Sequence, residues 1–301
     1  MLATFKRYLA PLAALFAVPA AVSAAPAPAS VETAKPALWE VSDPDTTIYL
    51  FGTIHLLPEN YAWRTKAIDT AISRSESLVV ETIVDDKNPK ELIEAMTRLG
   101  YSPGQLPLAE RVPAEKRQML ETAIAKTGIP RPIFDKMETW VAAFSLLGVQ
   151  FADIGVKGQH GVEQTLRDAF GTAGKTIGQL ETNAEQLSFF DTLPEQAQRE
   201  LLEGAIEAPE KMGADFTAML RSWARGDVDA IAKTFNSELG SSPAIRDALL
   251  VRRNANWSQW VEQRLAKPGT VLVAVGAGHL AGPDSVQDLL QREGYKVRRL
   301  Q

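Results

Sequence analysis

The chain of 301 residues lacks cysteine entirely and contains only three histidines. Without cysteine, no disulfide can form and no lipid-modified cysteine can follow an export signal, so stability must come from a packed core. Basic residues are also few, with 32 lysines and arginines against 37 acidic residues, and no basic tract occurs. The composition therefore argues against nucleic acid and anionic lipid as partners.

Residues 1–24 have the order of an export signal, because Lys6 and Arg7 precede an apolar stretch that ends at the small residues Val22-Ser23-Ala24. The apolar stretch is too short and wrongly flanked for a stable membrane span. Residues 25–36 follow as a linker rich in proline and alanine. We therefore expect an exported protein, periplasmic or secreted, with no membrane span after the signal is removed.

Several signatures of well-known enzymes are missing or incomplete. Neither His-Glu-x-x-His nor Gly-x-Ser-x-Gly occurs, which excludes the simplest zinc-peptidase and serine-hydrolase interpretations. Residues 171–176 resemble a phosphate-binding loop, but Ala169 stands in place of its first glycine and the expected elements come in the opposite order. Residues 276–281 fit a loose dinucleotide fingerprint, but the chain ends at Gln301 without room for another βαβ unit.

The most informative pattern occurs twice and consists of an apolar run that stops at Gly-x-x-His. Residues 47–51 lead to His55 and residues 271–275 lead to His279, in each case through a glycine three positions before the histidine. A buried apolar run that ends at glycine predicts a central strand with a sharp turn at its carboxyl end, where α/β sheets assemble their sites. Two imidazoles at one rim of a sheet would suit a metal ion.

Glu81 ends a third run of this kind, residues 77–80. Taken alone, a carboxylate or a histidine at the end of a strand is often an ordinary rim residue. If the fold brings them together, His55, Glu81 and His279 would bind a divalent metal and leave a position open for water. Such a water becomes a nucleophile near neutral pH.

Four other residues are weaker candidates. His160 lies in a glycine-rich segment before an expected helix at residues 162–170, and Glu163 follows within that helix. We favour a helix-start residue for His160, with a third imidazole or a proton carrier as the alternative. Glu181 follows a short apolar segment. Arg253 lies on a long amphipathic helix, where it either faces solvent or orients a carboxylate and stabilises an oxyanion.

The order of expected elements predicts an α/β fold. Residues 38–41 and 46–51 flank the turn-favouring sequence Ser42-Asp43-Pro44-Asp45, which predicts a hairpin. A helix over residues 65–73 and a strand over residues 77–80 follow.

The middle of the chain is mostly helical, and its end returns to α/β. The expected middle segments are helices at 119–124, 133–147, 216–223 and 248–261 and a strand within 175–180. The expected final segments are a strand at 270–275, a helix at 283–291 and an extended segment at 295–300. We therefore expect one domain over residues 37–301, a central mixed sheet built from the N- and C-terminal segments, with a large helical insertion, approximately residues 89–267, over the strand-end rim.

Seven short stretches, taken together, resemble the TraB/GumN family, which is related to the Tiki metalloproteases and more loosely to the erythromycin-esterase and ChaN-like proteins. The stretches keep the family's order through nearly the whole expected domain: residues 38–41, 50–55, 79–82, 161–163, 180–182, 253–254 and 275–280. The resemblance implies that His55, Glu81 and His279 form the metal or catalytic site, with Arg253 and Glu163 nearby. From the Tiki-like relatives it also implies a peptidase that uses manganese or cobalt, and zinc would suit the same ligands.

These interpretations combine into the expectation of an exported metal-dependent hydrolase that acts on a peptide or protein substrate. The metal would polarise the scissile carbonyl and activate water, Glu81 or Glu163 would move the proton, and Arg253 would steady the oxyanion. The alternative is a non-catalytic periplasmic protein that binds haem or another ligand through the same histidines, since the ChaN-like relatives are associated with haem. No pattern in the sequence indicates an oligomeric state.

Overall fold

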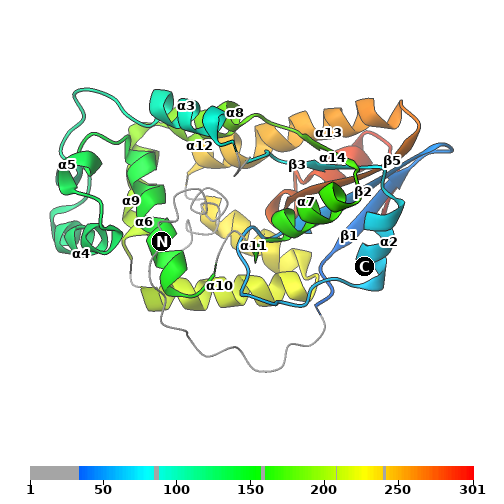
Figure 1. Ribbon diagram of the computed structural model, residues 1–301, viewed down its shortest axis with the longest axis horizontal. Coiled ribbons are helices and arrows are strands. Elements are labelled where there is room, and N and C mark those ends of the chain that lie inside the picture. Colours follow the sequence, from blue (N-terminus) through cyan, green and yellow to red (C-terminus); the bar gives the residue numbers. More distant parts are fainter. Residues whose placement is uncertain (1–33, 85–87, 157–159, 208, 240–241) are drawn as a thin grey trace.

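The computed structural model describes residues 34–84, 88–156, 160–207, 209–239 and 242–301. The expected export signal and most of the expected linker lie outside these residues. Within them, six strands form one mixed sheet in the order β4-β3-β5-β2-β1-β6, which confirms the expected α/β fold. Figure 1 shows the sheet at one end of the molecule and a group of helices from the middle of the chain at the other.

One side of the sheet is antiparallel. β1 (Leu38–Ser42) pairs with β2 (Thr46–Thr53) as the expected hairpin, and β6 (Val297–Arg299) pairs with β1 at the edge. The turn between β1 and β2 is held by the Thr46 N–H, which donates to Asp43 Oδ1 at 2.7 Å. The turn residues favoured by the sequence therefore fix the register of the hairpin.

The other side of the sheet is parallel and contains the two repeated apolar runs. It consists of β2, β5 (Gly269–Gly276), β3 (Ser77–Val80) and β4 (Thr176–Gln179). Parallel strands direct their carboxyl ends to the same edge of a sheet. This edge is therefore the place where residues from four distant segments meet.

Both faces of the sheet are covered by helices, so the strands are apolar on both sides. On one face, Val271 and Val273 of β5 pack in a core with α13 (Arg252–Leu265) and α14 (Val286–Arg292). On the other face, Leu272 and Ala274 pack in a core with α2 (Lys66–Arg74) and α7 (Val162–Thr172). The alternation of successive residues between two cores explains why the run is continuously apolar.

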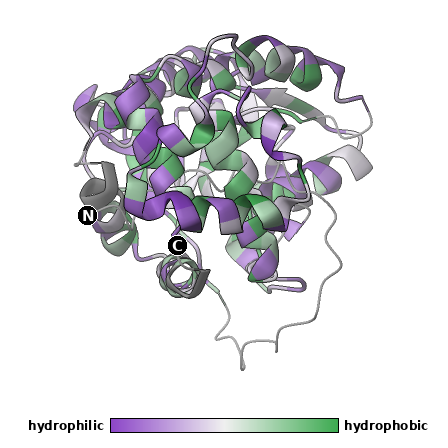
Figure 2. Ribbon diagram, turned by 90° about the vertical axis from the view of Figure 1, so that its left-hand side faces the viewer, coloured by the Kyte–Doolittle hydropathy of each residue, from purple (hydrophilic) through white to green (hydrophobic). Residues whose placement is uncertain are grey.

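The remaining helices come from the middle of the chain and share the second of these cores. They are α3 (Lys90–Leu99), α4 (Arg117–Thr127), α5 (Arg131–Phe134), α6 (Thr139–Asp153), α8 (Asn183–Asp191), α9 (Glu195–Ala205), α10 (Pro209–Ala224), α11 (Val228–Leu239) and α12 (Pro243–Arg246). Figure 2 looks onto this end of the molecule and shows hydrophilic and hydrophobic residues alternating along the helices. Among the described residues, no helix has both the length and the apolar character needed to cross a membrane.

Two expected helices differ from the observed ones. The helix expected over residues 133–147 is interrupted between α5 and α6, because the buried Arg111 guanidinium donates to the backbone carbonyls of Asp135 and Met137. The helix expected to begin at residue 283 begins at Val286 instead. Asp284 has a φ of 61°, which is incompatible with the helix, and Ser285 caps the first turn.

Candidate functional site

The parallel edge of the sheet carries four of the candidate residues. Glu81 directly follows β3, His55 comes two residues after β2, Glu181 two residues after β4, and His279 three residues after β5. His279 lies in a short 3-10 turn, Ala277–Leu280, that packs against β2. The topology thus converts positions far apart in the sequence into neighbours.

His55, Glu81 and His279 surround one point beside Gly276. A Cβ atom added to Gly276 would lie 3.1 Å from Glu81 Oε1, 3.5 Å from His55 Nε2 and 3.6 Å from His279 Cδ2. The absence of a side chain at Gly276 leaves this space open. The structure therefore brings together the three residues that the duplicated pattern and the family resemblance single out.

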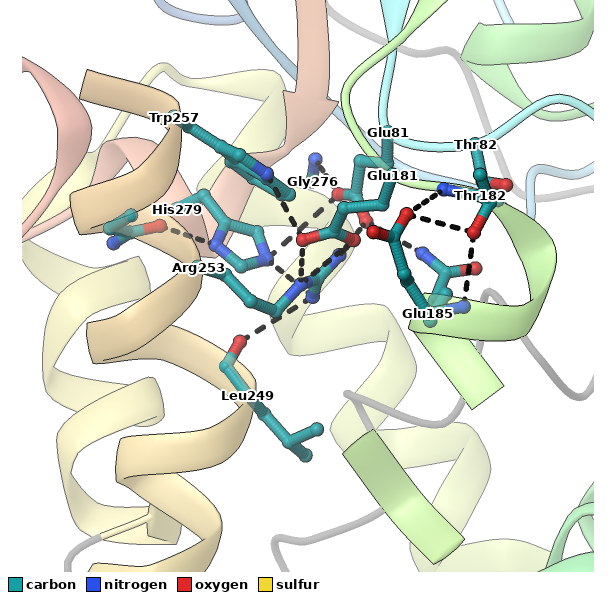
Figure 3. A network of polar contacts seen from close by, with 12 residues as sticks. Glu81, Thr82, Glu181, Thr182, Glu185, Leu249, Arg253, Trp257, Gly276 and His279 are labelled. Atoms are coloured by element: carbon teal, nitrogen blue, oxygen red, sulfur yellow. Dashed lines mark hydrogen bonds and ion pairs between the residues drawn. The ribbon is translucent and has the colours of Figure 1, made fainter. Parts of the chain in front are cut away.

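Arg253 lies at the centre of the polar network in Figure 3, between two carboxylates and an imidazole. Nε donates to Glu181 Oε1 at 2.9 Å, and Nη2 donates to Glu81 Oε2 at 2.7 Å and to Glu181 Oε2 at 2.8 Å. Nη1 lies 3.2 Å from His279 Nε2 and 3.4 Å from the Leu249 carbonyl. All five N–H groups of the guanidinium therefore have acceptors. Arg253 therefore serves to hold the residues of the rim together. It has no N–H group left with which to bind an oxyanion.

The helix that carries Arg253 begins in an unusual way. Residues Asp247–Val251 form a π-helical turn directly before α13, and Leu249, an acceptor for Arg253, lies in that turn. Such turns are rare and are frequent at functional sites. Trp257, one turn after Arg253, places its ring 4.6 Å from the guanidinium and donates from Nε1 to Glu181.

Glu81 is buried and ionised. Burial raises its pKa, but the charges of Arg253 and the neighbouring histidines, together with a hydrogen bond from the Gly276 N–H to Oε1 at 2.7 Å, lower the pKa to about 2. Gln186 of α8 also donates to Oε2, at 3.3 Å. A carboxylate with these partners holds no proton near neutral pH, which makes it a poor general acid.

The two histidines have opposite environments. Burial lowers the pKa of His279, and the adjacent Arg253 lowers it further, to about 3. Burial also lowers the pKa of His55, but the charge and hydrogen bond of Glu163 outweigh this and raise the pKa above its ordinary value. His279 is therefore neutral near pH 7, whereas the pKa of His55 lies above that of an ordinary histidine.

His55 and Glu163 form a hydrogen-bonded pair. His55 Nδ1 lies 2.8 Å from Glu163 Oε1, which also accepts from the Thr53 hydroxyl. The start of α7 is docked on this segment, because the Val162 N–H donates to the Ile54 carbonyl at 3.0 Å. The His55 side chain is 20% exposed, against 8% for His279. Within the described residues, its Nε2 has no hydrogen-bond partner and faces the space beside Gly276.

Two further candidates, Glu181 and His160, and two residues that the sequence did not single out, Trp257 and Gln186, also lie at or near the site. Burial raises the pKa of Glu181, whose carboxylate is bound to Arg253. His160 immediately precedes the N-cap residue of α7, and its Nδ1 is buried without a partner in the described chain. Trp257 could have been found, because it lies four positions after Arg253 on the same helix face. Gln186 gave no signal in the sequence.

A divalent cation does not fit this arrangement while Arg253 contacts Glu81 and His279. The charge states are suitable, because metal ligation requires an ionised Glu81 and a neutral His279. However, Arg253 already donates to Glu81 Oε2 and lies 3.2 Å from His279 Nε2, so the guanidinium occupies one ligand atom of each residue. In the part of the chain that the structure describes, no group of three or more histidine, aspartate or glutamate side chains is arranged to hold a metal ion.

Comparisons with known proteins agree with the resemblance in the sequence. The model of the TraB/PrgY/gumN family matches residues 37–299. The uncharacterized protein YbaP of Escherichia coli (strain K12) is 24% identical over 243 residues, which cover 81% of this chain and 87% of the relative. An uncharacterized protein of Treponema pallidum (strain Nichols) is 24% identical over 270 residues, covering 84% and 80%. No solved structure matches the chain.

Proposed function

The chain belongs to the TraB/PrgY/gumN family, and on that premise we propose that it is an exported hydrolase, a peptidase, that works at the strand-end rim around Gly276. The observation that carries the proposal is the His55–Glu163 pair, in which Nδ1 contacts a carboxylate and Nε2 has no hydrogen-bond partner in the part of the chain that the structure describes. An imidazole oriented in this way is the usual general base of hydrolytic enzymes. The peptide bond as substrate follows from the family resemblance.

In the proposed reaction, a water molecule binds between His55 and the carbonyl carbon of the substrate. His55 Nε2 takes a proton from the water as the water oxygen attacks that carbon, and Glu163 stabilises the imidazolium that forms. The same proton then passes from Nε2 to the leaving amine as the C–N bond breaks. The products are a carboxylic acid and an amine, and His55 returns to its neutral form.

Arg253 and Glu81 have a supporting role in this proposal. The guanidinium lies beside the reacting centre, so its charge steadies the negative charge that develops on the carbonyl oxygen. Because its N–H groups are already bonded, it acts through its field and does not donate a hydrogen bond to the substrate. Glu81 holds Arg253 and the Gly276 N–H in place, and Glu163 is the carboxylate that assists proton movement.

A divalent metal, with manganese, cobalt and zinc as the candidates, is a second form of the proposal. What supports it is the family resemblance and the charge states of Glu81 and His279. Arg253 would first have to leave both residues. Elemental analysis of the purified chain tests this form, since a bound metal would be found in a fixed ratio to protein.

The proposed function is tested by incubating the purified chain with a peptide library and identifying the products by mass spectrometry, with and without added manganese, cobalt and zinc. We expect the wild-type chain to cleave peptides and the His55→Ala variant to lose this activity. Equal cleavage by both chains would remove the proposal. A haem absorption band that is shifted by the wild-type chain and not by the variant, with no cleavage of any peptide, would favour the binding protein instead.

Export is part of the proposal and has its own test. The pattern of residues 1–24 supports cleavage after Ala24. Amino-terminal sequencing of the chain recovered from the periplasm or the medium of a bacterial host should therefore begin at Ala25. A chain that stays in the cytoplasm with Met1 intact would contradict this part alone.

A further inference from the structure

His279 is held at both ring nitrogens, and the two contacts agree on the position of its proton. Nε2 faces Nη1 of Arg253 at 3.2 Å. A guanidinium only donates, so Nε2 must carry the lone pair. Nδ1 faces Oδ1 of Asn254 at 2.6 Å. An amide oxygen only accepts, so Nδ1 must carry the proton.

The orientation of the Asn254 amide is set by a third group. Its Nδ2 donates to the backbone carbonyl of Asp284 at 2.7 Å. Because a carbonyl only accepts, the amide nitrogen must lie on this side, and the amide oxygen is left facing His279. Asn254 is fully buried and directly follows Arg253 on α13. If the amide were rotated by 180°, its NH2 group would face the protonated Nδ1 of His279, and its oxygen would face the carbonyl oxygen of Asp284.

Asp284 is itself anchored, so its carbonyl is a fixed reference. Its carboxylate accepts from Arg246 at 2.8 Å and from Arg292 at 3.3 Å. Its N–H donates to Asp288 Oδ2 at 3.0 Å. A chain of polar contacts therefore runs from α12 and α14, through Asn254, to the imidazole at the rim.

We propose that Asn254 is a positioning residue that holds His279 in its neutral tautomer with the proton on Nδ1 and the lone pair on Nε2. This tautomer gives Arg253 an acceptor and so keeps the guanidinium beside Glu81. In the other tautomer, two N–H donors would face each other across 3.2 Å and push Arg253 out of the network. An effect of this tautomer on activity rests on the proposed function, whereas the tautomer itself is inferred from the contacts of His279 alone.

Nitrogen-15 spectroscopy of the histidine rings tests the proposal directly in the wild-type chain. A ring nitrogen that carries a proton and one that carries a lone pair differ widely in chemical shift. The chain has only three histidines, so the His279 signals are assigned by their loss in a His279→Gln variant. We expect Nδ1 to be protonated and Nε2 to be unprotonated. The reverse pattern, or an average of the two, would overturn the proposal without any mutation of Asn254.

Variants of Asn254 separate positioning from mere packing. Asn254→Leu keeps the size but removes the acceptor, so the protonated Nδ1 signal should be lost or averaged. Asn254→Asp keeps an acceptor at Nδ1, so that nitrogen should stay protonated. Asn256→Leu, on the exposed side of the same helix, should leave the wild-type pattern unchanged. A folded Asn254→Leu chain with the wild-type pattern would contradict the proposal.

Cleavage assays on the same samples keep the two proposals apart. The expected ring pattern together with no cleavage by the wild-type chain would contradict the proposed function and leave the tautomer proposal standing. Cleavage together with the reverse ring pattern would support the proposed function and contradict the tautomer proposal. If both proposals hold, Asn254→Leu should also lower kcat/KM, and Asn254→Asp should restore part of it.

Discussion

At the scale of single residues, the main feature of this chain is a pair of histidines at equivalent strand ends with opposite electrostatics. Burial lowers the pKa of both rings; a carboxylate reverses this at His55, whereas a guanidinium adds to it at His279. Titratable groups whose environments push their pKa values apart commonly take different roles. His55, whose pKa is raised and whose Nε2 faces the space beside Gly276, is suited to proton transfer, and the buried, neutral His279 is suited to holding Arg253.

The first residue-scale prediction concerns Glu163. The Glu163→Gln change removes the negative charge that raises the pKa of His55. Because a general base must be neutral, kcat/KM rises with pH through the pKa of His55, and this rise should move to lower pH in the variant. The maximal rate should also fall, by about tenfold or more, since the ring loses a charged partner. The measurement is the pH dependence of kcat/KM, with Glu293→Gln, at an exposed position, as control. An unchanged profile would exclude Glu163 as the partner of the base.

The second residue-scale prediction concerns Arg253. The Arg253→Met change leaves Glu81 and Glu181 buried without their countercharge, so the free energy of unfolding should fall by about 3–5 kcal/mol. The neighbouring Arg252 makes an exposed ion pair with Asp247, and Arg252→Met should change stability by less than about 0.5 kcal/mol. Denaturant unfolding measures both variants. Equal stability of the two would show that Arg253 is not a clamp.

At the scale of elements, the side chains of the site approach the backbone closely at Gly276, the last residue of β5. Gly276 has a φ of −49°, so alanine can adopt this backbone conformation. Its Cβ would nevertheless lie 3.1 Å from Glu81 Oε1 and 3.5 Å from His55 Nε2. We predict that Gly276→Ala folds but loses most of its activity, because the methyl group occupies the space of the attacking water.

The matched control for that prediction is Gly171→Ala in α7, where an added Cβ meets no atom within 4 Å. This variant should keep its activity. Thermal unfolding and kcat/KM, measured on both variants, distinguish a blocked site from a damaged fold. Full activity in Gly276→Ala would mean that the reaction takes place elsewhere.

The strands could be predicted from the sequence, because a continuous apolar run bounded by glycine or turn residues depends only on local chemistry. Residues 77–80 and the hairpin before them agree with the observed β3, β1 and β2. The break between α5 and α6 could not be predicted from the sequence. It depends on Arg111, which is distant in the sequence and whose side chain donates to the backbone carbonyls at the break. Long-range bonds of this kind leave no periodic signal.

The same distinction applies to the site. The duplicated Gly-x-x-His pattern located His55 and His279, and the strand end located Glu81. The sequence did not reveal that Arg253 bonds to Glu81, Glu181 and His279 at once. Arg253 is separated from these partners by 26 to 172 positions, so only the folded chain brings the guanidinium to them.

At the scale of the whole molecule, folding brings Glu81 and His279 from the two ends of the chain into one buried site. Because their pKa values are shifted there, the stability of the fold depends on pH. In the folded chain the pKa of Glu81 is about 2 and that of His279 is about 3, below their ordinary values of 4.5 and 6.5. As the pH falls below 6.5, the unfolded chain takes up protons that the folded chain does not. The free energy of unfolding should therefore decrease on acidification. His55, whose pKa is raised, contributes in the opposite sense, with stability that is lost as the pH rises through its folded pKa.

We predict that the chain is less stable at pH 4.5 than at pH 7, with a contribution from His279 on the order of 2 kcal/mol. Replacing His279 with glutamine should reduce this difference, because the variant has no ring to protonate in the unfolded state. The Asn256→Gln variant, at an exposed position of α13 that carries no titratable group, is the control and should keep the wild-type difference. Denaturant unfolding at the two pH values is the measurement. An equal difference in all three chains would contradict the assigned environment of His279.

The measurement that tests the account most directly is the rate of peptide hydrolysis by the chelator-treated wild-type chain and by His55→Gln, determined side by side at neutral pH. If His55 is the base, the wild-type chain keeps its rate after chelation and the variant is slower by about 100-fold or more. Equal rates in the two chains, or a wild-type rate that vanishes with chelator and returns only with added metal, would contradict the account.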